Sequence, residues 1–141
     1  MRKSLDFALL LIRGALAVIF FAHGAQKVFG IFGGPGLKGF VGYMTHSGMP
    51  ALIPYLVAFG ELFGSIALSI GLLTRLAALG LFIEMTGAVL MVHAKNGFFM
   101  NWASVAGKGE GFEYALALAI VALGLVFAGP GAYSLDARMR R

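Results

Sequence analysis

The sequence predicts an all-α fold: a four-helix transmembrane bundle with a short interfacial helix after the first span. The main evidence is composition, because 60% of the 141 residues are hydrophobic and only 12% are charged. Soluble domains carry about 25% charged residues, so this chain has too little polar side chain to cover a water-exposed surface. Spans need about 20 apolar residues each, and the length allows four of them. We therefore expect a single integral membrane domain over residues 1–141.

The four spans are predicted at residues 5–29, 52–73, 76–94 and 112–128. Each must be a helix, because the hydrocarbon offers no water to satisfy open backbone groups. Pro50, Thr74-Arg75 and Gly129-Pro130-Gly131 punctuate the apolar runs. The glycine-rich stretch 96–111 is predicted to be irregular, with Trp102 as an interfacial anchor.

The first apolar run has features of a signal peptide, because Arg2 and Lys3 precede it and Ala22-His23-Gly24 resembles a cleavage site. The run is long, however, and Arg13 interrupts it. We expect a retained span.

A short helix is predicted after the first span. Leu37, Phe40, Val41 and Met44 follow the i, i+3, i+4, i+7 spacing of one helix face. Glycine and proline flank the segment, which fits an amphipathic helix in the outer interface. The alternative is a glycine-rich loop whose hydrophobic residues fall at this spacing by chance.

The basic residues predict the orientation, because cytoplasmic loops carry an excess of Lys and Arg. One side would hold six of them: Arg2, Lys3, Arg75, Arg138, Arg140 and Arg141. The other side would hold Lys38, Lys95 and Lys108, so both termini are expected to be cytoplasmic. The net charge of +5 is spread rather than clustered, which argues against nucleic acid as a partner. Without cysteine, the chain has no disulfide and no thiol chemistry.

Three charged residues fall inside the predicted spans. A charge at the bilayer centre costs roughly 2.5–3.5 kcal/mol, so Arg13, Glu61 and Glu84 should find partners. At 1.5 Å rise per residue they lie ~12, ~18 and ~14 Å from the cytoplasmic side. We therefore expect one Arg between two Glu, with one carboxyl protonated or paired with another cation.

Two histidines match in depth as well, since His23 and His93 both fall at ~27 Å. His23 and Lys27 are four residues apart and share a helix face. A bis-histidine haem is one interpretation, but histidines on apolar helices are more often hydrogen-bonded, and we predict no metal site.

Small residues accompany both glutamates. Gly60 and Gly64 form a GxxxG pattern beside Glu61, and Gly80 and Gly87 flank Glu84. Such spacing allows helices to approach closely, and close helix packing is the expected role of these glycines.

Several stretches together resemble the DoxX family of small bacterial membrane proteins. They are HGAQKVFG at 23–30 with GGPG at 33–36, FGELFGSIALSIGLLTRLAALGL at 59–81, and GPGAYSLD at 129–136. The resemblance covers nearly the whole chain in order. It implies a four-helix bundle in the bacterial cell membrane, and relatives include subunits of quinone-linked oxidoreductases. The family's recurring polar positions correspond to His23, Lys27 and Glu61, whereas Glu84 and His93 are added from their depth.

The leading hypothesis is a quinone-associated accessory subunit of a membrane oxidoreductase. His23 and Lys27 would donate to a quinone carbonyl, while Glu61 and Glu84 would carry protons. A ring slot would be lined by Phe20, Phe21, Phe29 and Phe32. No flavin, iron–sulfur or nicotinamide fingerprint is present. Electrons would therefore come from a partner subunit, and the chain would not be an enzyme alone.

Two alternatives stay open. A small proton-coupled transporter or permeation subunit would use Arg13, Glu61 and Glu84 as a relay, with a homodimer supplying the missing repeat. A structural membrane subunit would use the same charges only to pair helices. All three readings predict membrane lipid around the chain, and partner redox subunits or a homo-oligomer beside it. None predicts a catalytic residue or a covalently bound cofactor.

Overall fold

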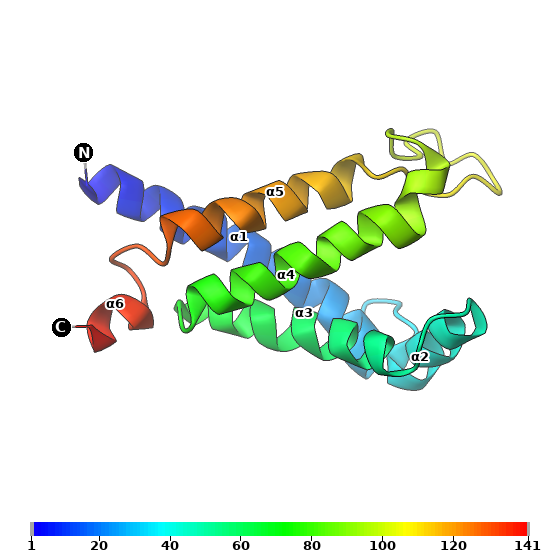
Figure 1. Ribbon diagram of the computed structural model, residues 1–141, viewed down its shortest axis with the longest axis horizontal. Coiled ribbons are helices and arrows are strands. Elements are labelled where there is room, and N and C mark those ends of the chain that lie inside the picture. The colour runs from blue at the N-terminus through cyan, green and yellow to red at the C-terminus, as the bar shows by residue number, and fades with distance from the viewer. Residues whose placement is uncertain (1, 141) are drawn as a thin grey trace.

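The computed structural model describes residues 2–140, which form helices joined by turns and loops, with no strand in that range. Four long helices run along the molecule: α1 (Arg2–Phe29), α3 (Leu52–Ile70), α4 (Thr74–Ala88) and α5 (Glu113–Ala128). Figure 1 shows the chain's two ends at the same end of this bundle. The short helix α2 (Gly36–His46) and the loop before α5 lie at the opposite end. The all-α prediction is confirmed.

Within residues 2–140, three helical segments are long and apolar enough to cross a membrane: Arg2–Phe29, Leu52–Ile70 and Thr74–Asn96. The fourth predicted span, α5, is apolar but has only 16 residues, or ~24 Å at 1.5 Å per residue. Apolar side chains such as Val18, Leu90 and Phe127 are more than two-thirds exposed in the single chain. Such a surface suits lipid rather than water.

Helix α1 buries one face against α3. The buried residues Leu9, Leu16, Phe20 and Gly24 recur at helical spacing. Gly24 is required at this contact, because a Cβ there would lie 2.7 Å from the backbone nitrogen of Leu62. The two backbones therefore touch, and this contact sets the register between α1 and α3.

The predicted helix after the first span is confirmed as α2, which packs against α1 and α3. Its predicted apolar face is half-buried, whereas Tyr43 on the other side is 72% exposed. Pro35 precedes the helix and Gly48 follows it with φ of 91°, a conformation that glycine adopts without strain.

Helices α3 and α4 meet at a tight turn and then diverge toward the opposite end of the bundle (Figure 1). Helix α3 ends at Gly71, whose φ of 70° is the left-handed C-cap conformation. Helix α4 continues as a π-helical turn, η1 (Val89–His93), and a 3₁₀ turn, η2 (Ala94–Asn96). A π-turn inside an α-helix is uncommon and often accompanies a functional site.

The segment 97–112 has no regular helix, as predicted, but its own side chains organise it. Glu113 Oε1 accepts hydrogen bonds from the Met100 backbone N–H and the Trp102 indole N–H, at 3.0 and 2.9 Å. Asn101 donates to the carbonyls of Val105 and Lys108. The exposed Trp102 is thus held in place at the end of the bundle predicted to face outward.

The chain after α5 closes the other end of the bundle. This arrangement was not predicted from the sequence. It includes the five-residue helix α6 (Leu135–Met139). The Asp136 carboxylate accepts from the backbone N–H groups of Leu73 and Thr74, at 2.7 and 2.8 Å. Thus a residue of the C-terminal segment caps the first turn of α4. Asp6 of α1 likewise accepts from the Ala132 N–H at 2.9 Å.

Candidate functional site: a cavity between α3 and α4

A cavity of about 840 Å³ lies where α3 and α4 diverge, and α1, α2, η1 and α5 also contribute to its walls. Its lining is mainly apolar. Leu56, Phe63, Leu76 and Ile83 line it and are each about 60% exposed. These exposed residues belong to helical segments that are long and apolar enough to span a membrane, and an exposed apolar surface of this kind suits lipid.

Both helices present a stripe of small residues to this cavity. Gly60, Gly64 and Ala67 line it from α3, and Gly80 and Gly87 line it from α4. Apart from the neighbouring backbone of its own helix, a Cβ at Gly80 or Gly87 would meet no atom of residues 2–140 within 4 Å, so the expectation of close packing is wrong for these two glycines. It is confirmed for Gly60 and Gly64, where a Cβ would lie 3.4 Å from Glu84 Oε2 and from the Leu81 side chain of α4. A closer contact between helices is made by Gly24, whose packing role was not predicted.

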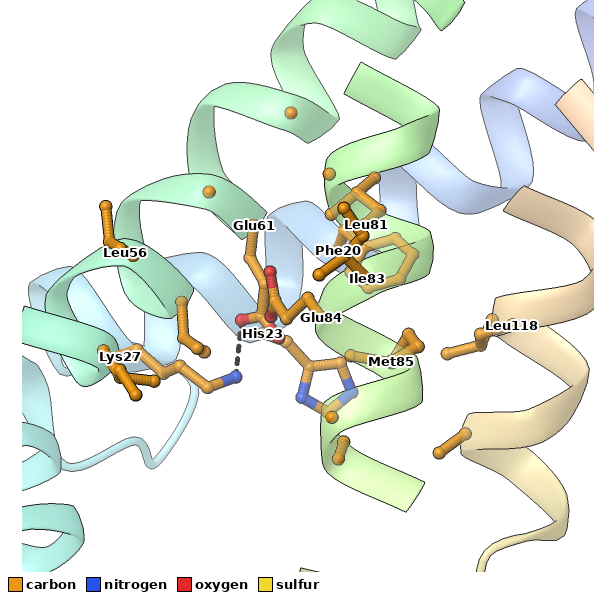
Figure 2. A pocket seen from close by; sticks show the side chains of 18 of the residues that line it. Phe20, His23, Lys27, Leu56, Glu61, Leu81, Ile83, Glu84, Met85 and Leu118 are labelled. Atoms are coloured by element: carbon orange, nitrogen blue, oxygen red, sulfur yellow. Dashed lines mark hydrogen bonds and ion pairs between the residues drawn. The ribbon is translucent and has the colours of Figure 1, made fainter. Parts of the chain in front are cut away.

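Polar side chains gather at one place in the cavity wall, as Figure 2 shows. Lys27 of α1 forms an ion pair with Glu61 of α3, with Nζ 2.5 Å from Oε2. The two side chains are only 18% and 4% exposed. The Lys27 ammonium also lies 5.5 Å from the centre of the Phe40 ring of α2, within cation–π range. This interaction ties three helices together.

Glu84 reaches the same cluster from α4 (Figure 2). Its carboxyl lies beside that of Glu61 in the cavity wall. Its Oε1 is buried, and within residues 2–140 no hydrogen-bond partner reaches it. The predicted association of Glu61 with Glu84 is therefore present, with Lys27 as the cation beside it. We call Lys27, Glu61 and Glu84 the carboxyl cluster.

Arg13 is not the cation of this cluster, contrary to the expectation from depth. Its fully buried guanidinium donates to the Leu68 carbonyl at 2.8 Å and to the Tyr133 carbonyl at 2.5 Å. The reason is the register set by Gly24 against Leu62. Lys27 is one helical turn beyond Gly24 and therefore lies beside Glu61. Arg13 lies ~21 Å from Lys27 along α1, at the end of the bundle that the C-terminal segment closes.

The two histidines both line the cavity. His23 lies four residues before Lys27 on α1, and Figure 2 shows its ring beside the cluster. His93, in the π-turn, has Nδ1 3.0 Å from the Glu110 carbonyl oxygen. Among residues 2–140, no group of three or more His, Cys, Asp or Glu side chains is placed to hold a metal ion.

The aromatic slot is only partly as predicted. Phe20 lines the cavity, but Phe21, Phe29 and Phe32 do not and are exposed. Phe40, Phe63 and Tyr114 line it instead, with a set of methionines: Met44, Met49, Met85 and Met91. Phe40 was findable, because it belongs to the predicted apolar face of α2. The contributions of α5 and the π-turn had no sequence signal, since they depend on how the helices cross.

Residues 8–94 of the chain match the DoxX family. The chain belongs to this family. The matched region contains all six predicted site residues, Arg13, His23, Lys27, Glu61, Glu84 and His93, whereas the C-terminal segment lies outside it. The DoxX chain is therefore a membrane protein, in agreement with its three long apolar helices.

Similar proteins come from distant bacteria. The chain is 30% identical to a Bacillus subtilis protein named "Putative oxidoreductase CatD", over 89% of this chain and 83% of that one. It is 32% identical to an uncharacterized Haemophilus influenzae protein over 96% and 93% of the two chains. It is 29% identical to an uncharacterized membrane protein of Mycobacterium tuberculosis over 92% and 80%. No solved structure matches the chain.

Proposed function

We propose that this DoxX protein is a quinone-associated accessory subunit of a membrane oxidoreductase, with the quinone head group in the α3–α4 cavity. The observation that carries the proposal is the combination of a large, mainly apolar cavity with one polar cluster in its wall. Small-molecule sites typically have this composition, with volumes of about 300–1,000 Å³ and few polar groups.

The chemistry of a quinone matches a cavity that is apolar except for one polar cluster. Its ring is flat and apolar, and suits the Phe20, Phe63 and methionine lining. Its carbonyl oxygens need donors, which Lys27, His23 and a protonated Glu84 would supply. Its isoprenoid tail would leave through the open side between α3 and α4 into lipid.

The redox role is supported by one relative whose name describes an oxidoreductase. The chain itself has no cysteine and no nucleotide-binding glycine fingerprint after a strand. Electrons would therefore be supplied by a partner subunit, and this DoxX chain would bind and protonate the quinone rather than reduce it alone.

Quinone content per chain tests the proposal in protein purified gently from its native membrane. We expect near-stoichiometric quinone in the wild type and a loss of most of it in Gly80→Leu, whose side chain would fill the cavity. Gly124→Leu is the matched control, because Gly124 lies on α5 outside the cavity and also has open space. Quinone at the bulk lipid level in folded wild-type protein would refute the proposal.

A proton-coupled transporter is the second candidate, favoured by one specific observation: the carboxyl cluster has one more acid than base. Proton-driven uptake into vesicles that contain only this chain would support it.

A purely structural role predicts instead that Glu61→Gln weakens assembly but leaves the activity of the remaining complex intact.

A further inference from the structure

We infer that the carboxyl cluster is electrically neutral and holds one exchangeable proton, which resides on Glu84. This deepens the proposed function, because it names the residue that would donate to the quinone. It concerns the ligand-free protein, however, and can be tested without any quinone.

The titratable side chains that share the cavity with Glu84 come from four other elements. Lys27 and His23 come from α1, Glu61 from α3, His93 from the π-turn and Tyr114 from α5; all line the same cavity. Only Lys27 is ion-paired within this set across residues 2–140, and its partner is Glu61. Lys27 and Glu61 thus cancel, and Glu84 remains.

Figure 2 shows the Glu84 carboxyl beside that of Glu61. Two ionised carboxylates at one site repel each other, so one of the pair takes up a proton. Glu61 accepts the Lys27 ammonium at 2.5 Å, which favours its charged form. The proton therefore belongs to Glu84.

The surroundings of Glu84 favour the neutral acid. Glu84 Oε1 is buried, and the part of the chain from 2 to 140 offers it no donor. An ionised oxygen in that position would be desolvated without compensation, which is far more costly than a neutral acid. Within an apolar cavity on a spanning helix the neutral form is the stable one.

The consequence is an acid that stays protonated at neutral pH and lies in the wall of an apolar cavity. A quinone carbonyl placed beside it can accept its hydrogen bond, because a protonated carboxyl is a donor. When that proton leaves, the cluster carries a net negative charge, so another proton must return to restore neutrality.

Infrared spectroscopy counts such protons directly, since a protonated carboxyl has a C=O stretch above the amide I band. The chain suits the measurement because it has only six acidic residues. The other four, Asp6, Glu110, Glu113 and Asp136, are not buried. We expect a carboxylic acid band in ligand-free wild type at neutral pH, shifted in D₂O and absent in Glu84→Gln.

Neutrality makes further predictions for the neighbours. In Glu61→Gln the band should also disappear, because Glu84 becomes the only counter-ion of Lys27. In Lys27→Met the band area should about double, because both carboxyls must then be protonated. The exposed-loop variant Glu110→Gln should leave the band unchanged. His23→Asn should also leave the band unchanged, because Lys27 rather than a protonated His23 balances the charge of Glu61.

Three results would overturn the inference: no band in folded wild type, a full band in Glu84→Gln, or a larger band in His23→Asn. The last would mean that His23 carries the balancing charge. Failure of the quinone proposal looks different, because it would leave this band in place while the extracted quinone stayed at the bulk lipid level.

Discussion

Arg13 and Lys27 lie on the same side of α1, yet they bind different kinds of partner. Lys27 pairs with a carboxylate, whereas Arg13 donates to two backbone carbonyls. The planar guanidinium has several donors in fixed directions, which lets it join the end of α3 to the C-terminal segment. The depth of each residue, counted along its own span, could not separate these roles. That count ignores how the helices are shifted relative to one another along their axes.

Replacing Arg13 by methionine tests this structural role. The change removes two charge-assisted hydrogen bonds and leaves the Leu68 and Tyr133 carbonyls without this donor. We expect the free energy of unfolding in detergent micelles to fall by roughly 2–4 kcal/mol. Arg138→Met, at an exposed position of α6, should have little effect. Equal stability of the two variants would contradict the assignment.

At the scale of helices, glycine has two opposite uses in this chain. Gly24 lets α1 touch the backbone of α3, while Gly80 and Gly87 keep the α3–α4 cavity open. The sequence pattern predicts the helices themselves, because each apolar run is continuous. It does not distinguish the two uses of glycine, since that depends on which neighbouring helix each position faces.

A pair of alanine substitutions on α1 separates packing from helix propensity. Alanine is favoured over glycine in a helix interior by about 1 kcal/mol, so Gly14→Ala, where the space is open, should be neutral or stabilising. Gly24→Ala should destabilise, because its Cβ would clash with the backbone of Leu62. Thermal unfolding in detergent compares the two, and a stabilised Gly24→Ala variant would show that α1 and α3 are not in contact there.

The cap of α4 predicts a dependence of stability on pH. Burial raises the pKa of Asp136, but hydrogen bonds from Thr74 and Leu73 outweigh it and hold the pKa below the usual 3.8. A folded-state pKa that is lowered stabilises the protein above the unfolded pKa, and this contribution is lost as the pH falls through the folded value.

Asp136→Asn should therefore destabilise the protein at neutral pH by about 1 kcal/mol, because the neutral amide offers one acceptor oxygen where the carboxylate uses two. The difference from wild type should shrink below about pH 4, where the wild-type carboxylate also becomes protonated. Unfolding temperatures measured across this range check both statements. A difference that is constant down to pH 2 would contradict the role of the charge.

For the whole molecule, composition and the family resemblance were enough to predict an all-α DoxX membrane protein. The C-terminal closure and the cavity were not predictable, because each arises from contacts between segments distant in sequence. The pairing of Lys27 with Glu61 is the clearest case. This pairing depends on the register between α1 and α3 that Gly24 imposes. Gly24 is 38 positions from Leu62 in the sequence, but the two residues are in direct backbone contact.

Two features of the whole molecule support the predicted orientation, with both termini in the cytoplasm. Both chain ends lie at one end of the bundle (Figure 1), and most basic residues are predicted on that side. Because the chain has no cysteine, single cysteines at Arg138 and Val105 can be labelled unambiguously in intact cells. An impermeant maleimide should label Val105→Cys but not Arg138→Cys. The reverse pattern would place the termini outside the cell.

The most direct test of a quinone site between α3 and α4 is photolabelling with a quinone analogue that carries an azide on its ring, followed by peptide mass spectrometry. We expect adducts within residues 56–64 and 76–88, suppressed by excess unmodified quinone and by Gly80→Leu but not by Gly124→Leu. Adducts spread over lipid-facing positions such as Val18 and Phe127, without competition, would show that the α3–α4 cavity is not a quinone site.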